Sequence, residues 1–167
     1  MSLSKILKNT FLVIIFGLVV AACATKKTAV IDKYSKIDSQ IQGDVYIGTD
    51  TVEYLAKGVP DRVFFATNES VLTTASRDTL RKQAAWMRAN DSLSFTIEGH
   101  ADERGTREYN LALGERRANA AKDYLMTYGI SGNRLSVISY GKERPVNSGS
   151  NPLAWSQNRR SVTVKAN

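Results

Sequence analysis

The most informative stretch of the chain is an acidic turn followed by a helix that carries arginines. The turn runs from Gly99 to Thr106 around Asp102, and the helix brings Arg116 and Arg117. A carboxylate and a guanidinium held close together can bind two ends of one small ligand, since hydrogen bonds to charged groups contribute roughly 1.5–3 kcal/mol each. Adjacent helix positions point about 100° apart. Because Arg117 borders the apolar Ala118, we expect Arg117 to face the protein and Arg116 to face water.

Residue type alone leaves a simpler interpretation open for both groups. Asp102 could be a turn former that bonds its own backbone. Arg117 could be a solvated helix residue or an ion-pair partner of Asp123 or Glu115, and exposed pairs of that kind contribute little. The choice between a ligand site and an ordinary helix surface therefore needs further signals.

An enzymatic interpretation of the turn finds little support. A zinc site needs three or four ligands, whereas the chain has one histidine, His100, and one cysteine near its start. A Ser-His-Asp triad with Ser94 or Ser139 has no nucleophile-elbow motif. Asp102 and Glu103 are adjacent in a turn, so we expect their carboxylates to diverge instead of forming a glycosidase pair. We expect no catalytic residues, no metal and no cofactor.

The pattern becomes globular from Asp61 onward. Leu93, Phe95 and Ile97 alternate with polar residues, which indicates a strand with one buried face. We expect strands at 62–65, 93–97, 135–140 and 161–165, and helices from Thr73 or Thr74 to about 89, from Thr106 to just before Gly129, and over 152–158. Gly99 is expected to end the second strand.

This order is β-α-β-α-β followed by a short helix and a last strand. Strands joined through a helix should be parallel, with right-handed crossovers. The small residues of the second helix should allow it to pack closely on the sheet. The sequence therefore predicts an α/β sandwich, with helices on one face of a small mixed sheet.

The start of the chain is typical of a targeting segment. Lys5 and Lys8 precede an apolar run over 11–22, which is too short for a bilayer span of about 20 residues. Cys23 directly follows this run and resembles a lipobox cysteine, although Ala22-Cys23-Ala24 also fits an ordinary cleavage site. We interpret 1–22 as a signal peptide, 23–60 as a lipidated cysteine with a flexible tether, and 61–167 as the domain.

The net charge is consistent with an anionic partner. The formal charge is +7, and removal of Lys5 and Lys8 leaves about +5, which suits an anionic polymer, lipid headgroups or nucleic acid. Export argues against nucleic acid, and no stacking-platform motif is present.

Five blocks, in order, resemble the OmpA-like peptidoglycan-binding domain over about 61–164. They are Gly99-His100-Ala101-Asp102-Glu103-Arg104-Gly105, Tyr109-Asn110, Leu113-Gly114-Glu115-Arg116-Arg117-Ala118-Asn119, Ser139-Tyr140-Gly141 and Asn158-Arg159-Arg160. The resemblance implies an OmpA-like βαβαβ sandwich that binds the diaminopimelate residue of the wall's stem peptide. Asp102 would then take the ligand's ammonium, and Arg117 would clamp its carboxylate.

The resemblance extends the ligand site to residues of four segments. These are Phe65, Ala66, Thr67, Asn68, Arg104, Thr106, Asn110 and Arg160. Acidic residues are common in the family at the places of Ala66 and Asn68, so we expect backbone contacts rather than a side-chain contact from Ala66.

Together with the lipobox, the resemblance implies a non-catalytic link between outer membrane and wall. The expected partners are peptidoglycan, the outer membrane through the lipid on Cys23, and the Tol proteins TolB and TolA, with roles in envelope integrity and cell division. Two alternatives stay open. The domain could serve as a protein-interaction module without wall binding, or it could be a peptidoglycan hydrolase.

Overall fold

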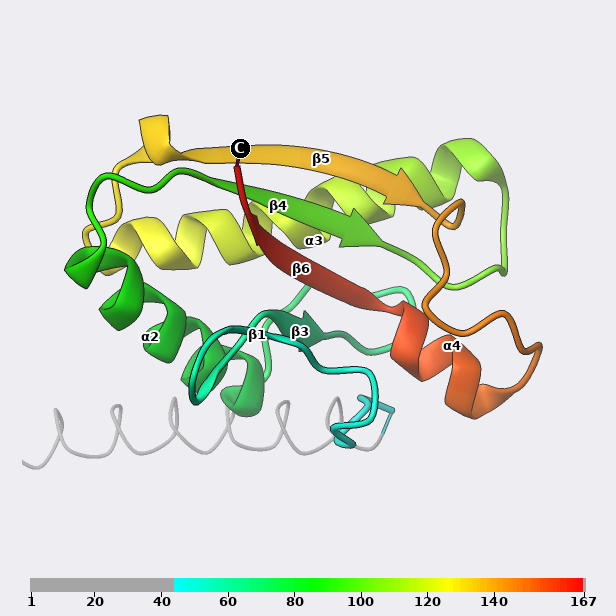
Figure 1. Cartoon of the computed structure of the whole chain (residues 1–167). Coiled ribbons are helices and arrows are strands. Elements are labelled where there is room, and N and C mark those ends of the chain that lie inside the picture. Colours follow the sequence, from blue (N-terminus) through cyan, green and yellow to red (C-terminus); the bar gives the residue numbers. More distant parts are fainter. Residues whose placement is uncertain (1–43, 167) are drawn as a thin grey trace, which may run out of the picture. The chain divides into compact units, whose positions relative to one another are not determined.

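A four-stranded sheet and two long helices form the main body of the domain (Figure 1). The computed structural model describes residues 44–166, so the expected signal peptide, Cys23 and residues 24–43 lie outside the described residues. The elements are β1 Tyr54–Ala56, β2 Val59–Pro60, β3 Arg62–Phe64, α2 Thr74–Ala89, β4 Phe95–His100, α3 Arg107–Thr127, the 3₁₀ helix η1 Gly132–Arg134, β5 Leu135–Gly141, α4 Pro152–Asn158 and β6 Arg160–Lys165.

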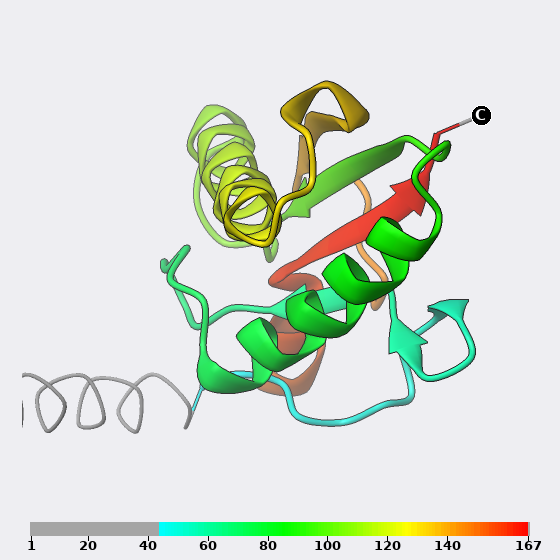
Figure 2. The same cartoon turned by 90° about the vertical axis from the view of Figure 1, so that its left-hand side faces the viewer.

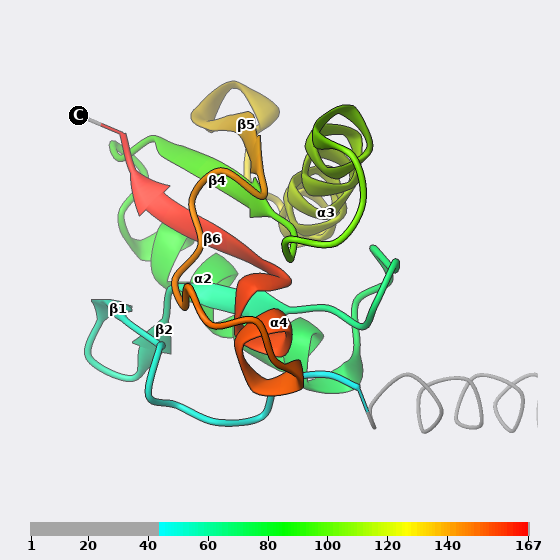
Figure 3. The ribbon, with the colours of Figure 1, turned by 90° about the vertical axis from the view of Figure 1, so that its right-hand side faces the viewer.

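The strand order in the sheet is β3-β6-β4-β5. β4 and β5 are parallel, and β6 is antiparallel to both β3 and β4. Figure 3 shows β6 alongside β4. The predicted mixed sheet is confirmed. β3 and β4 run in the same direction, as expected for strands joined by a helix, but the last strand of the chain lies between them.

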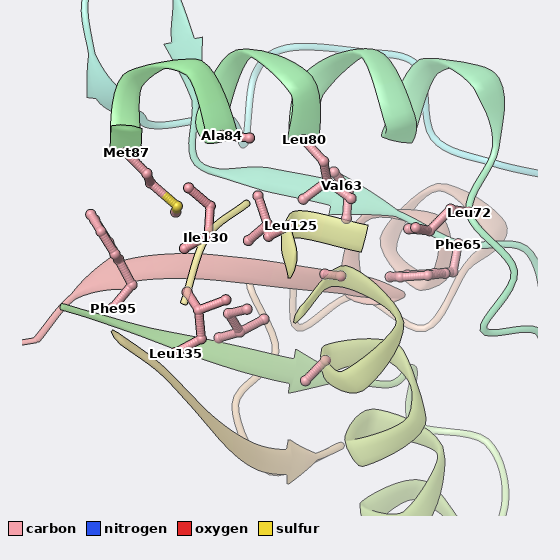
Figure 4. Packing of buried hydrophobic residues seen from close by; sticks show 13 residues of the cluster. Val63, Phe65, Leu72, Leu80, Ala84, Met87, Phe95, Leu125, Ile130 and Leu135 are labelled. Atoms are coloured by element: carbon pink, nitrogen blue, oxygen red, sulfur yellow. The ribbon is translucent and has the colours of Figure 1, made fainter. Parts of the chain in front are cut away.

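Helices α2 and α3 pack against one face of this sheet. Phe95 and Ile97 of β4 are buried in one core cluster with residues of both helices, whereas Thr96 and Glu98 face the opposite side. Figure 4 shows these core side chains between α2 and the strands. In Figure 2, α3 is seen nearly end-on beside β4, and α2 crosses in front of β3. The predicted arrangement of helices on one sheet face is confirmed.

Both long helices begin where the capping signals predict. Thr73 caps α2 by accepting from the Ser76 N–H at 3.1 Å, and Thr106 caps α3 by accepting from the Tyr109 N–H at 3.2 Å. Gly129, with φ of 83°, follows the end of α3 in the left-handed region that favours glycine.

The expectation that Gly99 ends its strand is wrong, because β4 continues to His100. A Cβ on Gly99 would collide with the backbone carbonyl of Gly114, and one on Gly114 would collide with Ser139 Oγ. The two glycines are therefore needed where α3 approaches the sheet most closely, not as a strand terminator.

The described part of the expected tether packs on the domain. The ring of Tyr46 makes an edge contact with Phe64 at 4.8 Å, and β1 and β2 form a small antiparallel hairpin. The backbone N–H of Asp61 donates a hydrogen bond to the backbone carbonyl of Glu53, with an N–O distance of 2.9 Å. Within residues 44–166, no helix combines the length and apolar character that a membrane crossing requires.

We predict that Gly99→Ala lowers the free energy of unfolding by about 1–3 kcal/mol, because the new methyl group must displace the backbone of α3. Urea denaturation followed by circular dichroism measures the change. Gly132→Ala is the matched control, since its Cβ would meet only the flexible end of Met126 at 3.4 Å. A Gly99→Ala variant as stable as this control would contradict the close-packing argument.

Candidate functional site

An open pocket of about 250 Å³ lies where the loops after β3 and β4 meet the first turns of α3. The lining residues are Thr67, Asn68, Asp102, Arg104, Gly105, Tyr109, Asn110 and Leu113. Five of the residues expected from the sequence, Thr67, Asn68, Asp102, Arg104 and Asn110, are thus brought together. Gly105, Tyr109 and Leu113 were not expected there.

Asp102 supplies a buried carboxylate to this pocket. Its oxygens accept from the Arg104 backbone N–H and Nε, both at 3.1 Å, from Arg104 Nη2 at 2.7 Å and from Arg159 Nη1 at 3.4 Å. Burial by itself would raise the pKa of Asp102, but the hydrogen bonds from Arg104 and the charges of Arg104 and Arg159 outweigh it and lower the pKa. Asp102 is therefore ionised at neutral pH.

Arg104 spans the mouth of the pocket. Its side chain is 42% exposed and forms the ion pair with Asp102. It also lies over the ring of Trp155 at 4.3 Å and donates to Thr67 Oγ1 at 3.3 Å. The Asp102 carboxylate at the pocket is thus already paired with the guanidinium of Arg104.

Arg117 lies behind the pocket and does not line it. Its side chain is fully buried, as the sequence predicts, while Arg116 is exposed. Nε donates to the Glu69 carbonyl at 2.8 Å, Nη1 to the His100 carbonyl at 2.8 Å and Nη2 to the Ala66 carbonyl at 3.0 Å. Arg117 therefore ties the loop after β3 and the end of β4 to α3.

The charge of Arg117 has no close counterion among residues 44–166, where no carboxylate lies within 4.0 Å of it. Burial, together with the positive charge of Arg159, lowers the pKa of Arg117 to about 9. A buried guanidinium held only by carbonyl oxygens creates a positive potential that favours an anion nearby.

The loop after β3 forms the other wall. Phe65 is fully buried, its ring lies 5.3 Å from the Arg117 guanidinium, and its carbonyl accepts from Arg159 Nε at 3.0 Å. Ala66 is also buried, and its carbonyl is held by Arg117. Asn68 adopts a left-handed φ of 60°, which asparagine tolerates.

Asn110 and Thr106 stabilise the acidic turn and the start of α3. Asn110 is 2% exposed and donates through Nδ2 to the Arg104 carbonyl at 2.8 Å. Thr106 is the N-cap of α3 and is absent from the lining of the pocket.

Arg160 lies apart from the pocket, and its neighbour Arg159 takes part instead. Arg160 donates to the Arg144 carbonyl at 3.2 Å, and burial together with the charge of Arg62 lowers its pKa to about 10. Side chains alternate between the two faces where a strand begins, so only one member of the pair can reach Asp102. That alternation is the signal by which Arg159 could have been considered from the sequence.

The two carboxylates of the turn diverge as expected. Glu103 is exposed and accepts from Trp155 Nε1 at 2.9 Å and from Ser150 Oγ, away from the pocket. Within residues 44–166, no group of three or more His, Cys, Asp or Glu residues is arranged to hold a metal ion.

Comparison with known proteins gives consistent matches. Residues 64–159 match the OmpA family. A peptidoglycan-associated lipoprotein of Mesorhizobium japonicum is 44% identical over 147 residues, which cover 88% of this chain and 85% of the relative. The crystal structure of the peptidoglycan-associated lipoprotein from Burkholderia pseudomallei matches with a TM-score of 0.62 at 34% identity, covering 64% of this chain and 90% of that chain. The C-terminal domain of Helicobacter pylori MotB, 18% identical with a TM-score of 0.60, covers 64% of this chain and 84% of that chain and shows the same fold.

We predict that Arg117→Ala destabilises the domain by about 3 kcal/mol or more, because it leaves a cavity and removes the donor from three backbone carbonyls, two of which belong to the buried Ala66 and His100. Arg116→Ala, at the exposed neighbouring position, should stay within about 0.5 kcal/mol of the wild type. Urea denaturation of both variants measures the difference. Equal stabilities would mean that the carbonyls find other donors.

A second prediction concerns His100, whose side chain is buried on the sheet face opposite the helices. Burial and then the charges of Arg160, Arg62 and Arg144 lower its pKa to about 3. As the pH falls below about 6.5, this histidine takes up a proton in the unfolded chain but not in the folded domain. The free energy of unfolding is therefore highest above that pH and decreases below it, by roughly 1.4 kcal/mol per pH unit.

Between pH 7.5 and 5 this group should contribute a loss of about 2 kcal/mol. His100→Leu removes the titrating group, so its free energy of unfolding should vary less over this range. Denaturant titrations of both proteins at several pH values measure the two slopes. Equal slopes would show that His100 takes up a proton as readily in the folded state as in the unfolded chain.

Proposed function

This chain belongs to the OmpA family, and from that premise we propose that it is an outer-membrane lipoprotein that binds peptidoglycan non-covalently. The similarity to peptidoglycan-associated lipoproteins extends over most of the chain. The observation that supports a ligand site most directly is the ionised carboxylate of Asp102, which lines the pocket together with Arg104 and is also bonded by the buried Arg159.

The proposed ligand is the diaminopimelate residue of the stem peptide, whose free end carries an ammonium and a carboxylate. In this proposal the ligand's ammonium replaces the Arg104 guanidinium at Asp102. The released Arg104 then pairs with the ligand's carboxylate. Because every charge keeps a partner throughout this exchange, binding avoids the cost of leaving a desolvated charge unpaired, about 3–5 kcal/mol.

Arg117 contributes to this proposal as the buried cation behind the pocket. A direct clamp by Arg117 on the ligand's carboxylate requires the loop at 65–69 to open, since the guanidinium is fully buried. Arg104, at the rim, meets the carboxylate first. The potential of Arg117 favours the same carboxylate without contact.

The wider role follows from the expected anchor and tether. A lipid on Cys23 holds the chain in the outer membrane, where two or more acyl chains give a stable anchor. Many reversible contacts with a polymer then add up to firm attachment. The proposed further partners are the Tol proteins, with functions in envelope integrity and cell division and without catalysis.

Titration with a diaminopimelate-containing stem peptide and its lysine-containing analogue tests the proposal. The lysine peptide lacks the distal carboxylate, so the pocket arginines lose their partner, and binding should weaken by at least about tenfold. Asp102→Asn should abolish measurable binding while preserving the fold. Asp91→Asn, an exposed aspartate just before β4, is the matched control.

Equal affinity for the two peptides would contradict recognition of the carboxylate. Failure of the wild-type chain to remain on purified sacculi would favour the protein-interaction module instead. Release of muropeptides from those sacculi would establish a hydrolase and contradict the binding-only proposal.

A further inference from the structure

Arg159 connects the pocket to the segment through which the chain enters the domain. This guanidinium is 2% exposed. Its Nε donates to the Phe65 carbonyl at 3.0 Å and its Nη1 to Asp102 at 3.4 Å. Its Nη2 donates to the Asp44 carbonyl at 2.5 Å and to Asp44 Oδ1 at 3.0 Å. One buried side chain therefore connects the loop after β3, the Asp102 carboxylate of the pocket and Asp44.

Asp44 also makes a direct hydrogen bond to a residue that lines the pocket. Its Oδ2 accepts from the backbone N–H of Thr67 at 2.8 Å, and Thr67 is a lining residue that in turn accepts from Arg104. Burial by itself would raise the pKa of Asp44, but the hydrogen bonds from Thr67 and the charges of Arg159 and Arg104 outweigh it and lower the pKa. The Asp44 carboxylate is thus ionised and engaged on two sides.

Asp102 is surrounded by positive charges, so a second carboxylate nearby, that of Asp44, changes how strongly these charges hold Asp102. Arg104 and Arg159 both donate to Asp102, and Arg117 lies near enough for its pKa to be affected by Asp102 and Arg159. With Asp44 in place, the Arg159 guanidinium forms ion pairs with two carboxylates, Asp44 and Asp102. Without Asp44, Arg159 would have Asp102 as its one ionic partner and would hold it more strongly against an incoming ammonium.

We infer that Asp44 is a positioning residue of the ligand pocket, so that ligand binding and the attachment of the tether to the domain are coupled. This inference rests on the proposed function. Asp44 precedes the family match, which begins at residue 64, and it belongs to the segment that the sequence predicts to be a tether. Removal of Asp44 weakens ligand binding in two ways, because the Thr67 loop loses its anchor and Arg159 competes for Asp102.

Coupling between two sites is reciprocal. A bound ligand therefore strengthens the hold of the pocket on Asp44. Conversely, a pull on the chain that withdraws Asp44 lowers the affinity for the ligand. A domain that begins at residue 61 would lack this carboxylate and should bind more weakly than the chain that includes it.

The test is a calorimetric titration of the full mature chain with the diaminopimelate-containing peptide. Asp44→Ala should weaken binding about tenfold, equivalent to about 1.4 kcal/mol. Asp44→Asn should lie between Asp44→Ala and the wild type, because its amide oxygen can still accept from Thr67 while the charge is lost. Asp50→Asn is the matched control, since this exposed aspartate of the same segment bonds Gln157 of α4 instead of the pocket.

Hydrogen exchange at the Thr67 amide gives a readout that a general loss of stability would not reproduce. Without ligand, this amide should exchange faster in Asp44→Ala than in the wild type, while core amides keep their protection. The ligand should slow its exchange in the wild type and have a smaller effect in Asp44→Ala.

The outcomes separate the two claims. No binding by the wild-type chain would overturn the proposed function and, with it, this inference. If the wild-type chain binds the peptide and both Asp44→Ala and Asp50→Asn bind it with that same affinity, the inference is overturned and the proposed function stands. A Thr67 amide that exchanges equally in the wild type and Asp44→Ala would likewise overturn it, because the loop would then not be anchored by Asp44.

Discussion

The burial of two guanidiniums behind the loop after β3 is the interaction on which the pocket depends. Arg117 donates to three backbone carbonyls, and Arg159 donates to two more, those of Phe65 and Asp44, and to the carboxylates of Asp102 and Asp44. A charge removed from water is tolerated only where hydrogen bonds and opposite charges compensate it. These contacts therefore stabilise the conformation of the loop, and among residues 44–166 the carboxylates of Asp102 and Asp44 form the ion pairs that offset the positive charge.

Close packing of α3 on the sheet puts Arg117 in that position. Gly99 and Gly114 remove the side chains that would separate the helix from β4. Ala118 and Ala121, both buried, continue the same close approach. A larger residue on this line would lift the helix and withdraw Arg117 from the carbonyls it holds, so that fold stability and site geometry share one cause.

The place of β6 in the sheet assembles the remaining part of the site. This strand runs antiparallel between β3 and β4, so its beginning lies at the edge where β3 and β4 end. Arg159, just before β6, is thereby brought between the loop at Phe65 and the turn at Asp102. The pocket combines the ends of two strands, the start of a third and the first turns of a helix, and no single segment contains it.

The sequence by itself determined the parts that depend on neighbouring residues. Capping by Thr73 and Thr106, the alternation in β4, the inward direction of Arg117 and the divergence of Asp102 from Glu103 all follow from local geometry, and each is found in the structure. The family resemblance also led us to expect the acidic turn and the loop after β3 at one place, and Thr67, Asn68 and Asp102 do line one pocket. Only the tertiary structure decided which partners these residues meet across long separations. Four features are of this kind: the position of β6 between β3 and β4, the contact of Asp102 with Arg159 instead of Arg160, the ion pair of Arg104 with Asp102, and the contacts of Asp44. The spacing of neighbouring residues does not predict them, because they depend on which segments the shared core brings together.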